Sequence, residues 1–189
     1  MTNIAIFASG SGTNAENIVN HFKNHSCICV KLIASNNAHA FVLERAKKLG
    51  VETLVFTKME LENGTFLHLL NEKKIDFIVL AGFLLKMPKE FVSAFPNKIV
   101  NIHPALLPKF GGKGMYGNKV HEAVIAAGEK ESGITIHYVN EEYDEGGIIF
   151  QAKCPVLDND TPDSLAKKVH ELEYLYFPSI LGNFILLKE

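Results

Sequence analysis

The N-terminal segment Asn3-Ile-Ala-Ile-Phe-Ala-Ser-Gly-Ser-Gly-Thr-Asn-Ala15 predicts the architecture of the first half of this 189-residue chain. Residues 3–8 are typical of a buried β-strand, since all but Asn3 are apolar, and the apolar spacing over residues 15–22 is typical of a helix. A glycine-containing loop joins the two. Such a strand–loop–helix unit is the repeating element of α/β folds with a parallel sheet.

Beyond this unit, strands and helices continue to alternate over the first hundred residues. The apolar periodicity predicts further strands at residues 28–35, 51–57, 75–81 and 98–102, and helices at residues 41–49, 66–74 and 89–95. Alternating strands and helices form a parallel sheet that helices cover on both faces.

The last ninety residues change character. Strands are predicted at residues 133–139 and 148–155, and the acidic, hairpin-like connection between them makes them antiparallel neighbours. Thr161 and Pro162 are residue types suited to a helix N-cap and to the first helical position, so a C-terminal helix is expected to begin there. We therefore predict an α/β fold, with an open, mostly parallel, Rossmann-like sheet, helices on both faces and antiparallel strands near the C-terminal end.

Composition and charge exclude several classes of protein. With 47% hydrophobic and 21% charged residues, and without an internal repeat or linker, the sequence predicts a single globular domain over residues 1–189. The 21 acidic residues outnumber the 19 basic ones, whereas gripping nucleic acid through its phosphates needs a basic excess. The longest stretch without charged or strongly polar residues, 77–85, is about half of a ~18-residue membrane span. The N-terminus has no features of an export signal, so we expect a cytoplasmic protein that binds neither nucleic acid nor a membrane.

The glycine loop, residues 9–14, is a candidate anion site. Arg45 is the only arginine among the 19 basic residues, so arginine forks contribute little to binding a phosphate or carboxylate. Backbone N–H groups at the start of a helix bind anions, and glycines let the ligand approach closely. Residues 35–37 contain no acid, which excludes a dinucleotide fingerprint, and no Gly-Lys-Ser/Thr follows, which excludes a P-loop. A site for one phosphate or carboxylate remains, formed by backbone amides and the Ser11 and Thr13 hydroxyls; a tight turn without a ligand is the alternative.

The strand predicted at residues 98–102 delivers two chemically active side chains. Asn101 and His103 alternate with apolar residues, so they point to one face at the carboxyl end of the strand, where ligands bind in open parallel sheets. An imidazole moves protons near pH 7, and a side-chain amide donates to a developing oxyanion; a structural pair that fixes the next loop is the alternative. The acidic run at residues 141–145 offers a carboxylate, and the glycines after it can turn Asp144 inward. Position alone does not separate Asp144 from its neighbours.

Four segments together resemble one enzyme family. They are Ser9-Gly-Ser-Gly-Thr-Asn14, Val79-Leu-Ala-Gly-Phe83, Val100-Asn-Ile-His-Pro-Ala-Leu-Leu-Pro108 and Glu142-Tyr-Asp-Glu-Gly-Gly-Ile-Ile-Phe-Gln151. In this order, and over nearly the whole chain, they are similar to the phosphoribosylglycinamide formyltransferases, folate-dependent enzymes of purine biosynthesis. The resemblance implies direct transfer of a formyl group from 10-formyltetrahydrofolate to the amine of glycinamide ribonucleotide, without a metal.

The resemblance also implies which residues perform the chemistry. Asn101, His103 and Asp144 match the family's catalytic residues. Asn101 and protonated His103 would stabilise the oxyanion, while Asp144 would hold His103 charged and help to relay the proton. His121 and His137 match histidines with supporting roles near the cleft.

Binding residues are implied for both substrates. Gly12, Thr13 and Asn14 match the loop that binds the substrate phosphate, and Glu173 matches a carboxylate near the ribonucleotide. The implied folate-binding residues are Leu84, Leu85, Lys86, Met87 and Asn101. On this basis the N-terminal half would bind the nucleotide phosphate, and the C-terminal half would carry folate binding and catalysis.

Two regions depart from the family pattern. Residues 109–119 form a longer and more glycine-rich segment than the family has, and it is either a mobile surface loop or a lid over the substrate. Leu85-Lys86 and Lys58-Met59 occupy regions where family members often place arginine. A lysine supplies charge there but no bidentate fork.

Three alternatives share some of these features. Methionyl-tRNA formyltransferase usually has a further C-terminal domain and a basic face for tRNA. Formyltetrahydrofolate deformylase, a hydrolase, usually has an extra N-terminal regulatory domain and needs no phosphate loop. A non-catalytic nucleotide-binding module would leave Asn101, His103 and Asp144 unexplained. Formyl transfer between small molecules, by a monomer or homodimer, is the favoured hypothesis.

Overall fold

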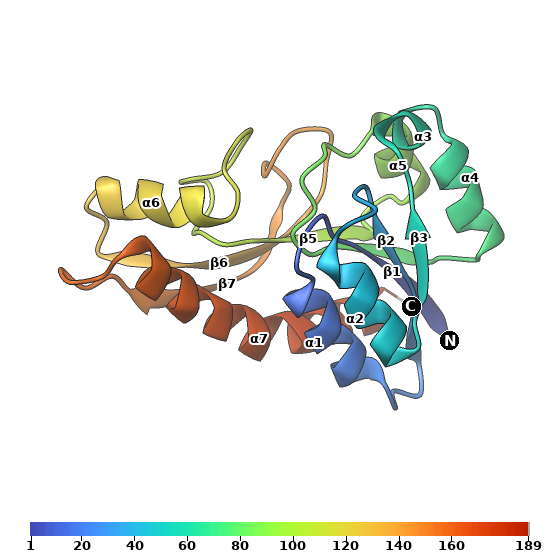
Figure 1. The fold of residues 1–189 in the computed structure, drawn as a ribbon, viewed down its shortest axis with the longest axis horizontal. Coiled ribbons are helices and arrows are strands. Elements are labelled where there is room, and N and C mark those ends of the chain that lie inside the picture. Colours follow the sequence, from blue (N-terminus) through green and yellow to red (C-terminus); the bar gives the residue numbers. More distant parts are fainter. Residues whose placement is uncertain (189) are drawn as a thin grey trace. The chain divides into compact units, whose positions relative to one another are not determined.

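The computed structural model describes residues 1–188. The chain forms two compact units, Met1–Val100 and Asn101 onward, which we call the first and the second unit and describe separately. Figure 1 shows the course of the chain through both. That the two units together form a single domain, as the sequence indicates, stays a prediction.

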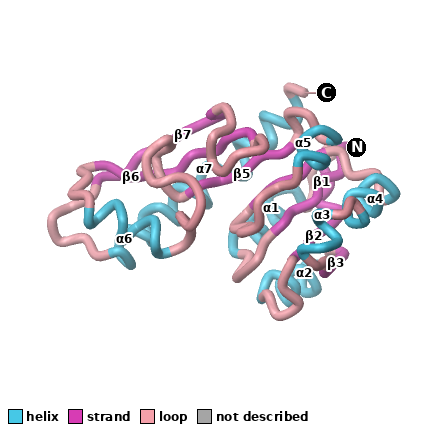
Figure 2. Tube along the Cα trace, turned by 90° about the horizontal axis from the view of Figure 1, so that it is seen from above, coloured by secondary structure: helices cyan, strands magenta, loops and turns pink. Residues whose placement is uncertain are grey.

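The first unit contains a parallel sheet. Its strands are β1 (Thr2–Phe7), β2 (Ile28–Ser35), β3 (Glu52–Val55) and β4 (Phe77–Leu80). They neighbour one another in the order β3-β2-β1-β4, and every paired strand is parallel to its partner. Figure 2 shows β3, β2 and β1 side by side in this order. The carboxyl ends of all four strands therefore lie at one edge of the sheet.

Both faces of this sheet are covered. The helices of the first unit are α1 (Thr13–Phe22), α2 (Phe41–Leu49), α3 (Lys58–Glu62), α4 (Thr65–Glu72) and α5 (Lys89–Ala94). All four residues of β4 are buried, and consecutive residues of a strand point to opposite faces, so apolar partners lie on both sides. On one face Phe7 packs against Phe56, Phe66 and Phe83. Helices α1 and α2 contact each other and β2.

The second unit is built on an antiparallel pair. Strand β5 (Ile99–His103) crosses the boundary at residue 100, and it is followed by β6 (Glu131–Tyr138) and β7 (Ile148–Pro155). Strands β6 and β7 run antiparallel, with an irregularity between Ile136 and His137. The helices are α6 (Asn118–Ala126) and α7 (Pro162–Leu186), and α7 contacts α6, β6 and β7.

The predicted fold class is confirmed, with parallel strands in the first unit and antiparallel ones toward the C-terminal end. Thr161 caps α7 as expected, since its side chain accepts a hydrogen bond from the Ser164 N–H. Two helices were not predicted. Helix α3 has only five residues, and α6 begins inside the segment 109–119 that the sequence indicated as a loop. Within residues 1–188, no helix is long and apolar enough to span a bilayer.

Candidate functional site

The carboxyl ends of three first-unit strands meet at Ser9. Its N–H donates to the Gly82 carbonyl at 3.0 Å, and its hydroxyl donates to Asn36 Oδ1 at 2.7 Å. The same hydroxyl accepts from the Leu84 N–H at 3.0 Å. The structure thus brings the glycine loop beside residues 84–87, the segment predicted to bind folate.

The glycine loop has the backbone geometry that an anion site requires. Gly12 caps α1 with φ 74°, a conformation that favours glycine. A Cβ atom on Gly12 would lie 2.2 Å from Cγ2 of Val42, because α2 packs directly on the loop. Thr13 and Asn14 begin α1, and the N–H groups of a first helical turn have no partner within their own helix. The three residues predicted to hold a phosphate therefore present backbone donors, and their role stays a prediction.

The predicted folate segment, residues 84–87, runs from the surface into the core. Leu84 is exposed, whereas Met87 is buried. All four residues belong to the first unit, so of the predicted folate residues only Asn101 lies in the C-terminal half to which folate binding was assigned.

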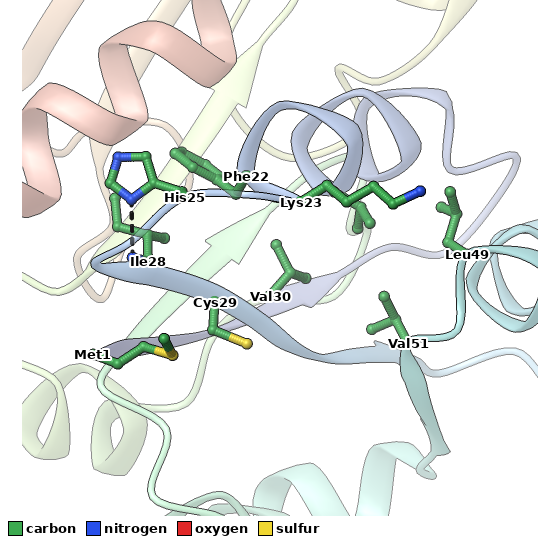
Figure 3. Close-up of a pocket in the computed structure, with 10 residues that line it drawn as sticks. Met1, Phe22, Lys23, His25, Ile28, Cys29, Val30, Leu49 and Val51 are labelled. Carbon is green, nitrogen blue, oxygen red and sulfur yellow. Dashed lines mark hydrogen bonds between the residues drawn. The ribbon is translucent and has the colours of Figure 1, made fainter.

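A pocket of about 240 Å³ also lies in the first unit, and Figure 3 shows its lining. Met1, Ile28 and Val51 stand at or before the amino ends of β1, β2 and β3. The glycine loop follows the carboxyl end of β1. This pocket is therefore at the opposite end of the strands and does not belong to the predicted site.

In the second unit the structure brings the three predicted catalytic residues together. His103 Nδ1 lies 3.5 Å from Asp144 Oδ2, and Asn101 Nδ2 lies 3.5 Å from Asp144 Oδ1. The Asn101 amide also donates to His137 Nε2 at 3.0 Å. We call Asn101, His103, His137 and Asp144 the histidine cluster. Its side chains are largely buried, with 4% of His103 and 12% of Asp144 exposed.

Backbone carbonyl oxygens determine which ring nitrogen carries a hydrogen in each imidazole of the histidine cluster. His103 Nε2 lies 2.7 Å from the Phe110 carbonyl oxygen, and His137 Nδ1 lies 2.7 Å from the Tyr138 carbonyl oxygen. A carbonyl only accepts hydrogen bonds, so these two nitrogens carry hydrogens. In neutral His103 the bare Nδ1 then faces Asp144, while in neutral His137 the bare Nε2 accepts from Asn101.

Burial and charge shift the pKa values of this cluster in opposite directions. Burial lowers the pKa of His103 below its ordinary value, although the charge of Asp144 acts in the raising direction. Burial on its own would raise the pKa of Asp144, but the two neighbouring histidines and the Gly112 N–H outweigh it, so that pKa lies below its usual value. The expectation that Asp144 holds His103 charged stays a prediction, and burial of the imidazole opposes it.

Close backbone packing turns Asp144 inward from its acidic loop. Asp144 has φ 57°, and the Gly112 N–H donates to its Oδ2 at 2.9 Å. A Cβ atom on Gly146 would lie 1.7 Å from the Tyr138 carbonyl oxygen, so only glycine fits there. The tight turn that these glycines predicted is present, and it singles out Asp144 from its neighbours.

The start of the segment 109–119 lies against the histidine cluster. Phe110 supplies the carbonyl that accepts from His103, and Gly112 supplies the N–H that donates to Asp144. Residues 110–112 therefore form part of the cluster's wall. The remainder of the segment leads into α6.

Glu173 is a buried carboxylate on α7 with a partner that sequence reasoning missed. His170 Nδ1 lies 2.7 Å from Glu173 Oε2, and this hydrogen bond raises the pKa of His170. The spacing i, i+3 of a histidine and a glutamate in a helix was the available signal. His121 on α6 is also buried, and burial followed by the charge of His170 lowers its pKa. Within residues 1–188, no three His, Cys, Asp or Glu side chains gather as a metal site.

Comparisons with known proteins agree on one family. Residues 2–181 match the family model described as formyl transferase. The chain is similar to "Phosphoribosylglycinamide formyltransferase, chloroplastic" of Arabidopsis thaliana, with 42% identity over 95% of this chain and 64% of the relative. It is 34% identical to phosphoribosylglycinamide formyltransferase of Haemophilus influenzae, over 97% of this chain and 87% of the relative. The crystal structure of phosphoribosylglycinamide formyltransferase from Bacillus halodurans superposes with a TM-score of 0.89 at 35% identity, covering 100% of this chain and 97% of that one.

Proposed function

The chain belongs to the formyl transferase family, and from this premise we propose that it transfers a formyl group from 10-formyltetrahydrofolate to the amine of glycinamide ribonucleotide in purine biosynthesis. The observation that carries the proposal is the contact of Asn101, His103 and Asp144 in a chain whose relatives bear that enzyme's name. The chain spans 64% of the length of the Arabidopsis relative. The folate donor is inferred from the family and the ribonucleotide from the relatives' names.

In the proposed reaction the substrate amine attacks the formyl carbon. A carbon–nitrogen bond forms to the amine, the bond from the formyl carbon to N10 of the folate breaks, and the proton lost by the amine reaches N10. The charge develops on the formyl oxygen. Asn101 and His103 are the donors available to this oxyanion, since each carries N–H groups at one strand end.

His103 would act from its neutral Nε2–H form. Burial lowers its pKa, and the Nε2 hydrogen is already directed at the Phe110 carbonyl oxygen. The oxyanion would replace that carbonyl as the acceptor. The carboxylate of Asp144, 3.5 Å from Nδ1, would stabilise the positive charge that the imidazole gains as its Nε2–H binds the oxyanion.

The first unit would bind the substrates. Gly12, Thr13 and Asn14 would hold the ribonucleotide phosphate through backbone N–H groups, and residues 84–87 would line the folate pocket. Glu173 of the second unit would contact the ribonucleotide. A cytoplasmic location, the absence of nucleic-acid and membrane partners, a metal-free reaction and a monomeric or dimeric state stay predictions.

The test is an assay of formyl loss from 10-formyltetrahydrofolate with and without glycinamide ribonucleotide. We expect loss only when the ribonucleotide is present, together with formation of the formylated amide. Equal rates in both samples would identify a hydrolase instead, and no loss in either sample would leave a binding module. The His103→Ala variant is the matched control, because it keeps the glycine loop intact.

A further inference from the structure

Arg45, the only arginine of the chain, lies against the glycine loop rather than in solvent. Its Nε–H donates to the Ser11 carbonyl oxygen at 2.9 Å, and its Nη1 pairs with Glu16 of α1. The guanidinium carbon lies 5.0 Å from the centre of the Phe41 ring. About 25% of the side chain is exposed. One side chain of α2 thus contacts the loop, the helix that follows it and an aromatic ring.

The hydrogen bond to Ser11 matters because an anion site must keep carbonyl oxygens away from the anion. A loop that binds an anion through its N–H groups must direct its carbonyl oxygens elsewhere, since each carries partial negative charge. Two consecutive carbonyls of this loop are bonded to α2: Gly10 accepts from the Val42 N–H at 3.1 Å, and Ser11 accepts from Arg45. The Gly10 contact is a backbone bond, whereas the Ser11 contact depends on a side chain.

We propose that Arg45 is a positioning residue of the glycine loop, which holds the Ser11 carbonyl away from the bound phosphate and so keeps the N–H groups of Gly12 to Asn14 in binding geometry. The inference rests on the proposed function, because it takes a phosphate ester as the ligand of the loop. Arg45 acts through the backbone: its Nε and Nη1 are both engaged, and Glu16 neutralises its charge. A lysine cannot reproduce this role, because it lacks the planar fork that reaches two acceptors at once.

The test compares Arg45→Lys with the wild type in calorimetric titration with ribose 5-phosphate, a probe that needs no turnover. We expect the dissociation constant to rise about tenfold, as for loss of a charged hydrogen bond. In the transfer assay the KM for glycinamide ribonucleotide should rise by a similar factor with kcat nearly unchanged. A substrate that lacks the 5′-phosphate should show equal kcat/KM for both proteins. An unchanged dissociation constant, or an equal loss with the dephosphorylated substrate, would overturn the proposal.

Two further variants separate positioning from direct contact. Glu16→Gln releases the charge of Arg45; if Arg45 were itself a phosphate ligand, ribose 5-phosphate would bind more tightly, and that result would overturn the proposal. We expect unchanged or weaker binding. Lys48→Met removes an exposed charge from the same helix and should leave binding unchanged. Wild-type protein that binds ribose 5-phosphate in an Arg45-dependent way but transfers no formyl group would contradict the proposed function and leave the positioning role intact.

Discussion

The glycine loop and the histidine cluster are built in opposite ways. In the loop the groups proposed to bind the phosphate are backbone N–H donors, and the side chains of Arg45 and Val42 pack against that backbone. In the cluster the groups proposed to react are side chains, and backbone groups of Phe110 and Gly112 hydrogen-bond them. The loop therefore depends on φ angles and on close packing by neighbouring residues. The cluster depends on the identity, burial and protonation of a few side chains.

The largest expected effect separates chemistry from binding. His103→Ala removes a donor to the oxyanion and should lower kcat by at least ~10²-fold. Because the glycine loop is untouched, the dissociation constant of ribose 5-phosphate should change by less than about twofold. Steady-state kinetics and calorimetry on the same preparation measure both. Unchanged turnover would remove His103 from the mechanism.

A matched pair of glycine substitutions tests the loop. Gly12→Ala forces a side chain into φ 74° and against Val42, so ribose 5-phosphate binding should weaken at least about tenfold, and the free energy of unfolding should fall by at least ~1 kcal/mol. Gly10→Ala places its Cβ in open space at an ordinary φ and should change neither quantity. Calorimetry and urea denaturation provide the measurements. If the two variants behaved alike, close packing would not be what shapes the loop.

The pKa of His103 tests whether burial or the charge of Asp144 dominates in the histidine cluster. Burial lowers its pKa and Asp144 partly opposes this, so an NMR titration of the imidazole should give a pKa below the ordinary value of 6.5 in the wild type. In Asp144→Asn it should fall further, since the raising charge is gone. A pKa above the ordinary value in the wild type would show that Asp144 outweighs burial.

The smallest expected effect concerns the stability contributed by His170. Its pKa is raised in the folded state by Glu173, so its hydrogen bond stabilises the fold below the unfolded pKa of 6.5, and this contribution is lost as pH rises through the raised folded value. His170→Gln should therefore destabilise more at about pH 5.5 than at about pH 8.5. Urea midpoints at the two pH values measure the difference. A larger loss at the higher pH would reverse the assigned direction.

Most of the scaffold could be predicted from periodicity. Strands β2 and β7 have the predicted bounds, and turn residues mark one end of each: Asn36-Asn37 follow β2 and Gly146-Gly147 precede β7. Helix α3 was not predicted, because five residues are too few to show a helical period. Its capping box of Thr57 and Glu60 is nevertheless a recognisable signal of a helix start. Helix α6 was obscured by the glycines just before it.

The site was less predictable, because its important contacts join residues far apart in the chain. The approach of Asn101, His103 and Asp144 followed from the family resemblance, but the burial of His103 did not, and burial decides its pKa. The bond from Arg45 to Ser11 spans 34 residues and depends on how α2 packs. The apolar periodicity of α2 predicts which face of the helix is buried, but it does not predict which loop that face packs against.

The Ser9 hydroxyl, which bonds both Asn36 and Leu84, has a thermodynamic consequence. The same residue begins the loop assigned to the ribonucleotide and holds the first residue of the segment assigned to the folate. A coupling free energy between the two binding sites that depends on this hydroxyl must be reciprocal. The factor by which the ribonucleotide changes folate affinity then equals the factor by which folate changes ribonucleotide affinity. A Ser9→Ala protein keeps the backbone bond to Gly82 and would lose only the part of the coupling that the hydroxyl carries.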